Sequence, residues 1–496
     1  MALKVIELDA LIVGAGFGGV YQLKRLKDEG FNLKLVESGS DYGGVWYWNR
    51  YPGARVDSTI PHYEFSDADL YTGWMWSQRF PGSEELRKYF RYVAEKWKLV
   101  NDTQFSTLVT GAVWDETSSR WMISTNAGVT YKYLQGKKIA VIGTGSTGIR
   151  LCQDLAPLAS EFVLFQRTPN LALPMKQVQY DTHSTQAIPR EQYDELYKGR
   201  SSSYGGFNFN FLAKNTFDDS EEERLKTYED LWSHGDFHYW LATYQDMLFV
   251  DSANTEAYNF WRDKVRARLP NERLKEKFAP MQKPHAFGCK RISLENGFYE
   301  LFSQEHVHLV DVNETPIEEV TPQGIKTSEK VWEFDYVVCA TGFDAITGGM
   351  LFMNVEGRKY LRLQDKWADG VKTFMGLCVG DFPNMLFTYG PQAPTALCNG
   401  PSCAELQGEC IVSLLKQMRQ EGKQTVNASS VKEEEWAASV RAIANMSLLP
   451  GTKSWYMGDN IPGKKRECLI YLGGVPTYYK TITECAAKGY EGFEFA

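Results

Sequence analysis

Two glycine-rich turns carry the clearest chemical signal in this sequence of 496 residues. The first reads Gly-Ala-Gly-Phe-Gly-Gly at 14–19, and the second reads Gly-Thr-Gly-Ser-Thr-Gly at 143–148. In a G-x-G-x-x-G motif the first glycine allows a tight turn, the second lets the backbone approach a pyrophosphate, and the third lets a helix pack on a strand. The N-terminus of that helix attracts the anion. The pattern predicts two dinucleotide sites, with the candidate residues Gly14, Gly16, Gly19, Gly143, Thr144, Gly145, Ser146 and Gly148.

The residue at the end of the next strand distinguishes the two sites. Glu37 follows Gly19 by 18 residues, where a carboxylate can accept hydrogen bonds from ribose hydroxyls and repels a 2′-phosphate. Arg167 follows Gly148 by 19 residues, where a guanidinium can hold a 2′-phosphate through paired hydrogen bonds. Thr168 can add a hydroxyl. The first site therefore suits FAD or NAD and the second suits NADPH, and the pair indicates hydride transfer from NADPH to FAD.

The elements that position these residues follow one pattern twice, an apolar strand, the turn, a helix and a second strand. Between the two units and the tail, Leu, Trp and Tyr recur among charged residues at three- and four-residue spacing, which predicts a mostly helical insertion at about 171–280. The expected fold class is α/β, with two doubly wound, Rossmann-like domains. The expected boundaries are 1–135 and 335–496 for a discontinuous FAD domain and 136–334 for an NADPH domain that includes the insertion.

Composition excludes several other classes of protein. The formal charge of −8 argues against a nucleic-acid-binding surface, which needs a basic stripe. The N-terminal residues lack the pattern of a signal peptide, and no run approaches the roughly 18–20 apolar residues of a membrane span. The nine cysteines include no C-x-x-C pair, which predicts reduced cytoplasmic thiols with neither a metal site nor disulfides.

A longer segment after the first turn resembles a known family. Residues 43–57 read Gly-Gly-Val-Trp-Tyr-Trp-Asn-Arg-Tyr-Pro-Gly-Ala-Arg-Val-Asp, which closely resembles the flavin-site segment of Baeyer–Villiger monooxygenases such as phenylacetone, cyclohexanone and steroid monooxygenases. The resemblance covers almost the whole chain. It recurs at 141–148, 165–169, 287–291, 340–344, 454–456 and 487–493.

The resemblance implies an enzyme that uses NADPH, FAD and O2 to insert one oxygen atom beside the carbonyl of a small ketone, giving an ester or lactone. Arg291 matches the family's catalytic arginine, and Asp57 matches the carboxylate that orients it. A fixed cation in a dry site would stabilise the negative charge that develops in this reaction. The FAD site would further include Val45, Trp46, Tyr63, Val109 and Asp57 itself, and the NADPH site would further include Lys290 and Trp455.

One departure from the family pattern affects the expected fold. The family carries F-x-G-x-x-x-H-x-x-x-W/Y just before the second glycine turn, and this chain has no such segment. An expected strand at 129–134 is followed at once by 135–137 and the next Rossmann strand. One strand of the FAD sheet and one of the two interdomain linkers are therefore expected to be missing, and a missing central strand leaves its neighbour unpaired.

Three interpretations of this gap remain open from sequence. The chain is a transcript or gene-model variant of an ordinary monooxygenase, a natural variant that binds FAD with lost or changed oxidation chemistry, or an active enzyme in which another segment fills the gap. A non-enzymatic alternative is a flavin-dependent scaffold or sensor. Lys290, Arg291 and Asp57 argue against this alternative, because a scaffold needs no cation over a flavin.

Overall fold

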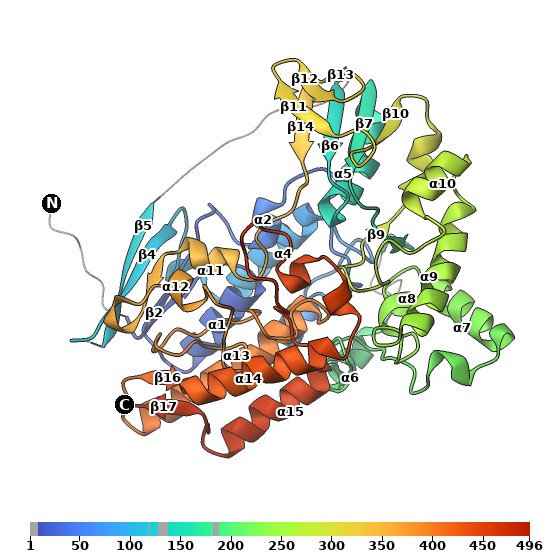
Figure 1. Cartoon of the computed structure of the whole chain (residues 1–496). Coiled ribbons are helices and arrows are strands. Elements are labelled where there is room, and N and C mark those ends of the chain that lie inside the picture. Colours follow the sequence, from blue (N-terminus) through green and yellow to red (C-terminus); the bar gives the residue numbers. More distant parts are fainter. Residues whose placement is uncertain (1–7, 118, 127–136, 182–187) are drawn as a thin grey trace.

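The computed structural model describes residues 8–117, 119–126, 137–181 and 188–496. Two parallel sheets follow the two glycine units, and helices pack around them (Figure 1). The second sheet and a three-stranded antiparallel sheet at 317–333 lie at one end of the molecule, and three C-terminal helices lie at the other. The strand expected at 129–134 falls outside the described residues. Among the residues that are described, no helix has the length and apolar character needed to cross a membrane.

The first sheet has the order β1-β2-β3. Its strands are β1 (Ala10–Val13), β2 (Leu33–Val36) and β3 (Thr103–Gln104). Helix α1 (Phe17–Asp28) follows β1 and buries Val20, Leu23 and Leu26, which share one face at helical spacing. Helix α4 (Ser83–Lys96) covers the same core with five buried residues. These elements present the first glycine turn at the carboxyl end of β1.

The second sheet has the order β10-β7-β6-β14, with all neighbours parallel. Its strands are β6 (Lys138–Ile142), β7 (Glu161–Gln166), β10 (Val307–Asp311) and β14 (Tyr336–Cys339). Helix α5 (Ser146–Leu155) starts in the second glycine turn. Because β14 pairs with β6, it belongs to this sheet, although we expected the FAD domain to resume at 335. We therefore propose that the domain boundary follows Cys339.

The insertion is mainly helical in its described part. Its α-helices are α6 (Tyr193–Gly199), α7 (Glu221–Ser233), α8 (His238–Leu241), α9 (Asp251–Arg266) and α10 (Glu272–Phe278). Ser220 caps α7 by accepting a hydrogen bond from the Glu223 backbone N–H. A two-stranded pair of β8 (Leu173–Pro174) and β9 (Leu294–Glu295) closes the insertion at its base. Helices α7 to α10 form one side of the molecule (Figure 1).

The C-terminal part packs against the first unit. Helix α13 (Gly400–Gln420) lies beside α1, where Arg25 Nε donates to Glu409 Oε1 at 2.6 Å and Tyr21 Oη donates to the same carboxylate at 2.6 Å. Helices α14 (Ser430–Asn445) and α15 (Gly474–Ala487) continue this layer. The remaining elements are α2 (Val45–Trp48), α3 (Ala68–Tyr71), β4 (Leu108–Asp115), β5 (Arg120–Asn126), β11 (Ile317–Thr321), β12 (Gly324–Thr327), β13 (Val331–Glu333), α11 (Gly348–Phe352), β15 (Val355–Glu356), α12 (Leu363–Lys366), β16 (Val426–Ala428) and β17 (Phe493–Phe495).

Strand β1 has an open edge within the described part of the chain. It pairs with β2 on one side, whereas the corresponding strand of the second unit, β6, lies between β7 and β14. None of the four residues of β1 is buried and Val13 is 47% exposed, while the three middle residues of β6 are buried. One strand of this sheet is expected from the sequence to be missing, and the loss of a neighbouring strand would leave β1 as an apolar strand with a free edge.

Candidate functional site

The first glycine turn has the backbone conformation that only glycine adopts easily. Gly14 has φ 98°, and a Cβ on Gly19 would lie 1.8 Å from the Gly14 carbonyl oxygen. Gly16 precedes α1 as its N-cap residue, and a Cβ there would meet Gly44 Cα at 3.4 Å. The turn therefore leaves the start of α1 and its backbone N–H groups free of side chains, as close approach of a pyrophosphate requires.

Glu37 lies directly against this turn. Its two carboxylate oxygens accept hydrogen bonds from the backbone N–H groups of Ala15 and Gly39, each at 2.7 Å, and the residue is 3% exposed. Ser38 Oγ donates to Oε1 at 3.1 Å. A carboxylate has about four acceptor positions, so these three bonds leave capacity for a ribose hydroxyl. The position and charge of Glu37 fit the adenosine half of a dinucleotide without a 2′-phosphate.

Four other predicted flavin-site residues are an aromatic pair, Trp46 and Tyr63, and two valines, Val45 and Val109. Trp46 is buried, donates from Nε1 to Tyr63 Oη at 3.1 Å and meets the Tyr63 ring edge to face at 5.9 Å. Val45, which starts helix α2, is 54% exposed beside this pair. Val109 is buried in strand β4, away from the aromatic pair in sequence. The aromatic pair offers a rigid apolar wall for a ring system, with a satisfied hydroxyl.

The second glycine turn repeats the first. Gly143 has φ 109°, and a Cβ on Gly148 would lie 2.1 Å from the Gly143 carbonyl oxygen. Gly145 is the N-cap residue of α5. Thr144 Oγ1 donates to the Thr168 carbonyl at 2.6 Å, which ties the turn to the residue after Arg167.

Side chains beyond the motif also brace this turn. Asn170 donates from Nδ2 to the Thr144 carbonyl and to Ser293 Oγ, both at 2.9 Å, and Ser293 Oγ lies 2.9 Å from Ser146 Oγ. Sequence reasoning missed Asn170 and Ser293. No local motif marks Ser293, but Asn170 follows Arg167 closely enough that a turn-bracing amide could have been suspected.

Two cations converge at the end of β7. Arg167 is exposed, and its backbone carbonyl accepts from Asn313 Nδ2 at 2.6 Å. Burial and the positive charge of Arg167 lower the pKa of Lys290, and Asp459 opposes this shift. Each of these two positive charges disfavours the other, and an anion between them would relieve that repulsion. The pair is therefore suited to a phosphate group at the end of the second sheet.

Arg291 and Asp57 meet between the two units. Arg291 Nη2 and Nε both donate to Asp57 Oδ2, at 2.8 and 3.2 Å, and Nη1 donates to the Ala396 carbonyl at 2.7 Å. Burial disfavours the guanidinium charge, but Asp57 and the hydroxyls of Tyr456 and Tyr389 together outweigh this effect and raise the pKa of Arg291. The structure thus holds a permanent cation in a fixed orientation, from elements separated by more than 200 residues.

Aromatic rings support this guanidinium. Its Cζ lies 5.2 Å from the centroid of the Phe237 ring and 5.8 Å from that of Trp240, in the range of cation–π contacts. Both rings come from the helical insertion, on and just before α8. Sequence reasoning missed them because their amphipathic spacing marks only core positions, and their contact with Arg291 depends on how the insertion folds back.

Trp455 is partly buried and packs edge to face on Tyr456 with ring centroids 4.4 Å apart. Tyr456 is fully buried, and its hydroxyl is among the groups that raise the pKa of Arg291. Trp455 is therefore the sequence neighbour of a residue, Tyr456, that influences Arg291.

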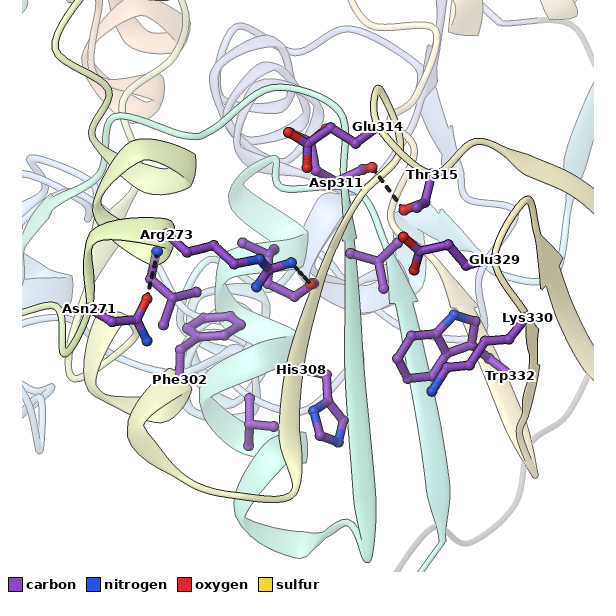
Figure 2. A pocket seen from close by; sticks show the side chains of 14 residues that line it. Asn271, Arg273, Phe302, His308, Asp311, Glu314, Thr315, Glu329, Lys330 and Trp332 are labelled. Atoms are coloured by element: carbon purple, nitrogen blue, oxygen red, sulfur yellow. Dashed lines mark hydrogen bonds between the residues drawn. The ribbon is translucent and has the colours of Figure 1, made fainter.

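A separate hollow of about 590 Å³ lies on the outer side of β10. Figure 2 shows Arg273, His308 and Trp332 around it, from α10, β10 and β13. Arg273 Nη2 donates to the Leu309 carbonyl at 3.2 Å, which covers part of the free edge of β10. Its lining includes neither glycine turn and neither Arg291 nor Asp57, so this hollow is distinct from the site described above.

Comparisons with known proteins agree with this geometry. A family model described as NAD(P)-binding Rossmann-like domain matches residues 12–72. The chain is 41% identical to cyclopentanone 1,2-monooxygenase of Comamonas sp., covering 99% of this chain and 96% of the relative. It is 35% identical to the methyl acetate-forming acetone monooxygenase of Gordonia sp., covering 99% of both chains. The structure of OTEMO in complex with FAD and NADP matches with a TM-score of 0.93 at 30% identity, over 99% of this chain and 100% of that one.

The fold and the site define a flavoprotein monooxygenase with two dinucleotide sites, whose cofactors are FAD and NADP(H). Within that class, the chain belongs to the Baeyer–Villiger monooxygenase family. These comparisons do not favour a family member that has lost its oxygenation activity. The alignments with the two relatives extend over 530 and 535 positions, more than the 496 residues here, so the relatives carry positions with no counterpart in this chain.

Proposed function

We propose that this enzyme converts small aliphatic ketones to esters or lactones, with Arg291 as the catalytic cation and Asp57 as its positioning residue. The two relatives named above act on cyclopentanone and acetone, a small ring and a small open-chain ketone. The observation that carries the proposal is the Arg291–Asp57 pair at 2.8 Å between the two dinucleotide units. A fixed cation there can stabilise an oxyanion as it forms.

The residues of each unit fit one cofactor. Glu37 and the first turn would hold the adenosine and pyrophosphate of FAD, and the Trp46–Tyr63 pair would bound its ring system. Lys290 and Arg167 would hold the 2′-phosphate of NADPH. When bound, the two cofactors supply the reducing equivalents and the activation of O2.

The protein's own contribution lies in charge and orientation. Asp57 and the Ala396 carbonyl fix three of the five N–H groups of Arg291. Phe237 and Trp240 shield it with apolar rings, which strengthens its field towards the space it faces. An apolar surface beside a fixed cation also suits a ketone, which has an apolar body and one polar oxygen.

Replacing Arg291 tests this proposal. Arg291→Ala is expected to lower ester formation by at least about 10²–10³-fold, the usual loss for a donor at a developing anion, while FAD stays bound. Product is measured by gas chromatography with cyclopentanone, and FAD by its absorbance. Arg441→Ala is the matched control, because Arg441 pairs with Glu434 on the surface of α14. An Arg291→Ala enzyme that forms ester at the control's rate would refute the catalytic role.

A further inference from the structure

We propose that His234, Asp236 and His238 form a binding site for one divalent transition-metal ion of the zinc type. The three residues stand at alternate positions of a single turn, and their candidate ligand atoms all lie within 4.8 Å of one another. Two imidazoles and one carboxylate are ligands that zinc, nickel and copper accept. The inference does not depend on the oxygenation reaction.

The backbone already holds these three residues on one side of the turn. His234 is the C-cap residue that follows helix α7, and Gly235 comes next with φ 61°. A Cβ on Gly235 would lie 2.3 Å from Lys176 Cβ, so the close approach of this neighbouring segment requires glycine. The Lys176 N–H donates to the Gly235 carbonyl at 2.9 Å, and Arg79 Nη1 donates to the His234 carbonyl at 3.0 Å. The turn is thus fixed independently of any ion.

The carboxylate is oriented as metal-binding carboxylates usually are, by a second partner on its other oxygen. Arg79 Nη2 holds Asp236 Oδ2 at 2.5 Å, and Asp236 is 4% exposed. The other oxygen, Oδ1, lies 2.6 Å from His238 Nδ1, so the two atoms share one proton. A divalent ion would replace that proton, with the two atoms moving apart by less than 1 Å to reach bond lengths of about 2 Å.

The third ligand needs a modest side-chain rotation. The rings of His234 and His238 stack with centroids 3.9 Å apart and planes 12° apart, so their nitrogen lone pairs do not yet converge. His234 is partly exposed, so its ring is the one expected to turn, while the His238 ring also contacts the Phe209 ring with centroids 4.0 Å apart. This open side also gives an ion its route of entry, and water can complete the coordination.

The position of the turn gives the site a connection to the rest of the molecule. Phe237 stands between two of the proposed ligands and contacts the Arg291 guanidinium at 5.2 Å. The ion would therefore bind within a few residues of the aromatic support of that cation.

The test uses the FAD-loaded full chain without an affinity tag. Zn²⁺ binding is measured by calorimetry, and Co²⁺ binding by its visible absorption, which reports nitrogen and oxygen ligands directly. We expect one saturable site per chain. His234→Gln and His238→Gln are each expected to weaken it at least about ten-fold, the lower end of the loss seen when even an outer-shell partner is removed.

His308→Gln is the matched control, because His308 lies on strand β10 at the hollow outside this turn. It is expected to bind Zn²⁺ as the parent does. Thermal unfolding and flavin absorbance verify that each variant is folded, so loss of binding with the parent's stability supports the site. Absence of a saturable site in the parent, or equal affinity in the His234 and His308 variants, would overturn the proposal.

Discussion

The selectivity for NADPH over NADH is the prediction that the structure specifies best. Arg167, which follows β7, and Lys290, whose pKa it lowers, are the proposed partners of the 2′-phosphate, the one group by which the two nucleotides differ. A hydrogen bond to a charged group contributes about 1.5–3 kcal/mol. Arg167 is exposed, so the lower part of that range applies, and about 1.5–2 kcal/mol corresponds to roughly 10–30-fold. Arg167→Ala is therefore expected to lower kcat/KM for NADPH by about that factor and to change the value for NADH by less than about two-fold.

The same pair predicts a dependence on pH. Burial and Arg167 lower the pKa of Lys290, so its charge is lost at a pH below the ordinary value of 10.5. The preference for NADPH should then decline as pH rises through the alkaline range, and Lys290→Arg should remove the decline because a guanidinium stays charged.

Both effects are measured by steady-state oxidation of NADPH and NADH at several pH values, with Arg441→Ala as the control. An equal loss of kcat/KM for both nucleotides in Arg167→Ala would refute the reasoning, because it would show that Arg167 contacts a part of the nucleotide that NADPH and NADH share.

Three further predictions concern folding and cofactor retention. Gly19→Ala should abolish FAD binding and Gly148→Ala should spare FAD but abolish NADPH binding, because each added Cβ would lie about 2 Å from a carbonyl oxygen. The control Gly111→Ala has open space around it and should bind both cofactors, as measured by flavin absorbance and nucleotide titration. Burial raises the pKa of Glu64 to about 7, so between its unfolded pKa near 4.5 and pH 7 the folded state binds a proton that the unfolded state does not, and the stability of the parent falls as pH rises. Glu64→Gln lacks this proton, so the Tm of the variant minus that of the parent should rise from pH 5 to pH 8. A constant difference in Tm would contradict this. Inserting the relatives' segment between the two glycine units should pair the free edge of β1 and raise FAD occupancy and ester formed per NADPH, whereas equal values in both proteins would show the segment to be dispensable.

The sequence was sufficient for the elements around the two glycine turns. The pattern of strand, turn, helix and strand occurs in both units as β1, α1 and β2 and as β6, α5 and β7, because short apolar runs end at polar or glycine residues and leave little freedom. The helical character of the insertion was predictable from its apolar spacing, but the start of α9 at Asp251 was not, because its first turn includes small and polar residues that this spacing does not mark.

The surroundings of Arg291 were beyond sequence reasoning. Its supports come from segments far apart in the chain, Asp57 before the first unit is complete, Phe237 from the insertion and Ala396 from the C-terminal part. A family motif can name Asp57 and Arg291, but a carbonyl group or a core-like phenylalanine has no signature until the fold brings it there.

The contact between α1 and α13 has a consequence for synthesis of the protein. Helix α1 emerges from the ribosome first among the helices, yet the helix that covers it begins at Gly400. At about 5–20 residues per second, roughly 20–80 s pass before that cover is made. During this interval the Tyr21 and Arg25 side chains of α1 lack the Glu409 carboxylate that accepts their hydrogen bonds in the folded protein. The face of the first unit that α13 covers is therefore expected to stay exposed to water until late in synthesis.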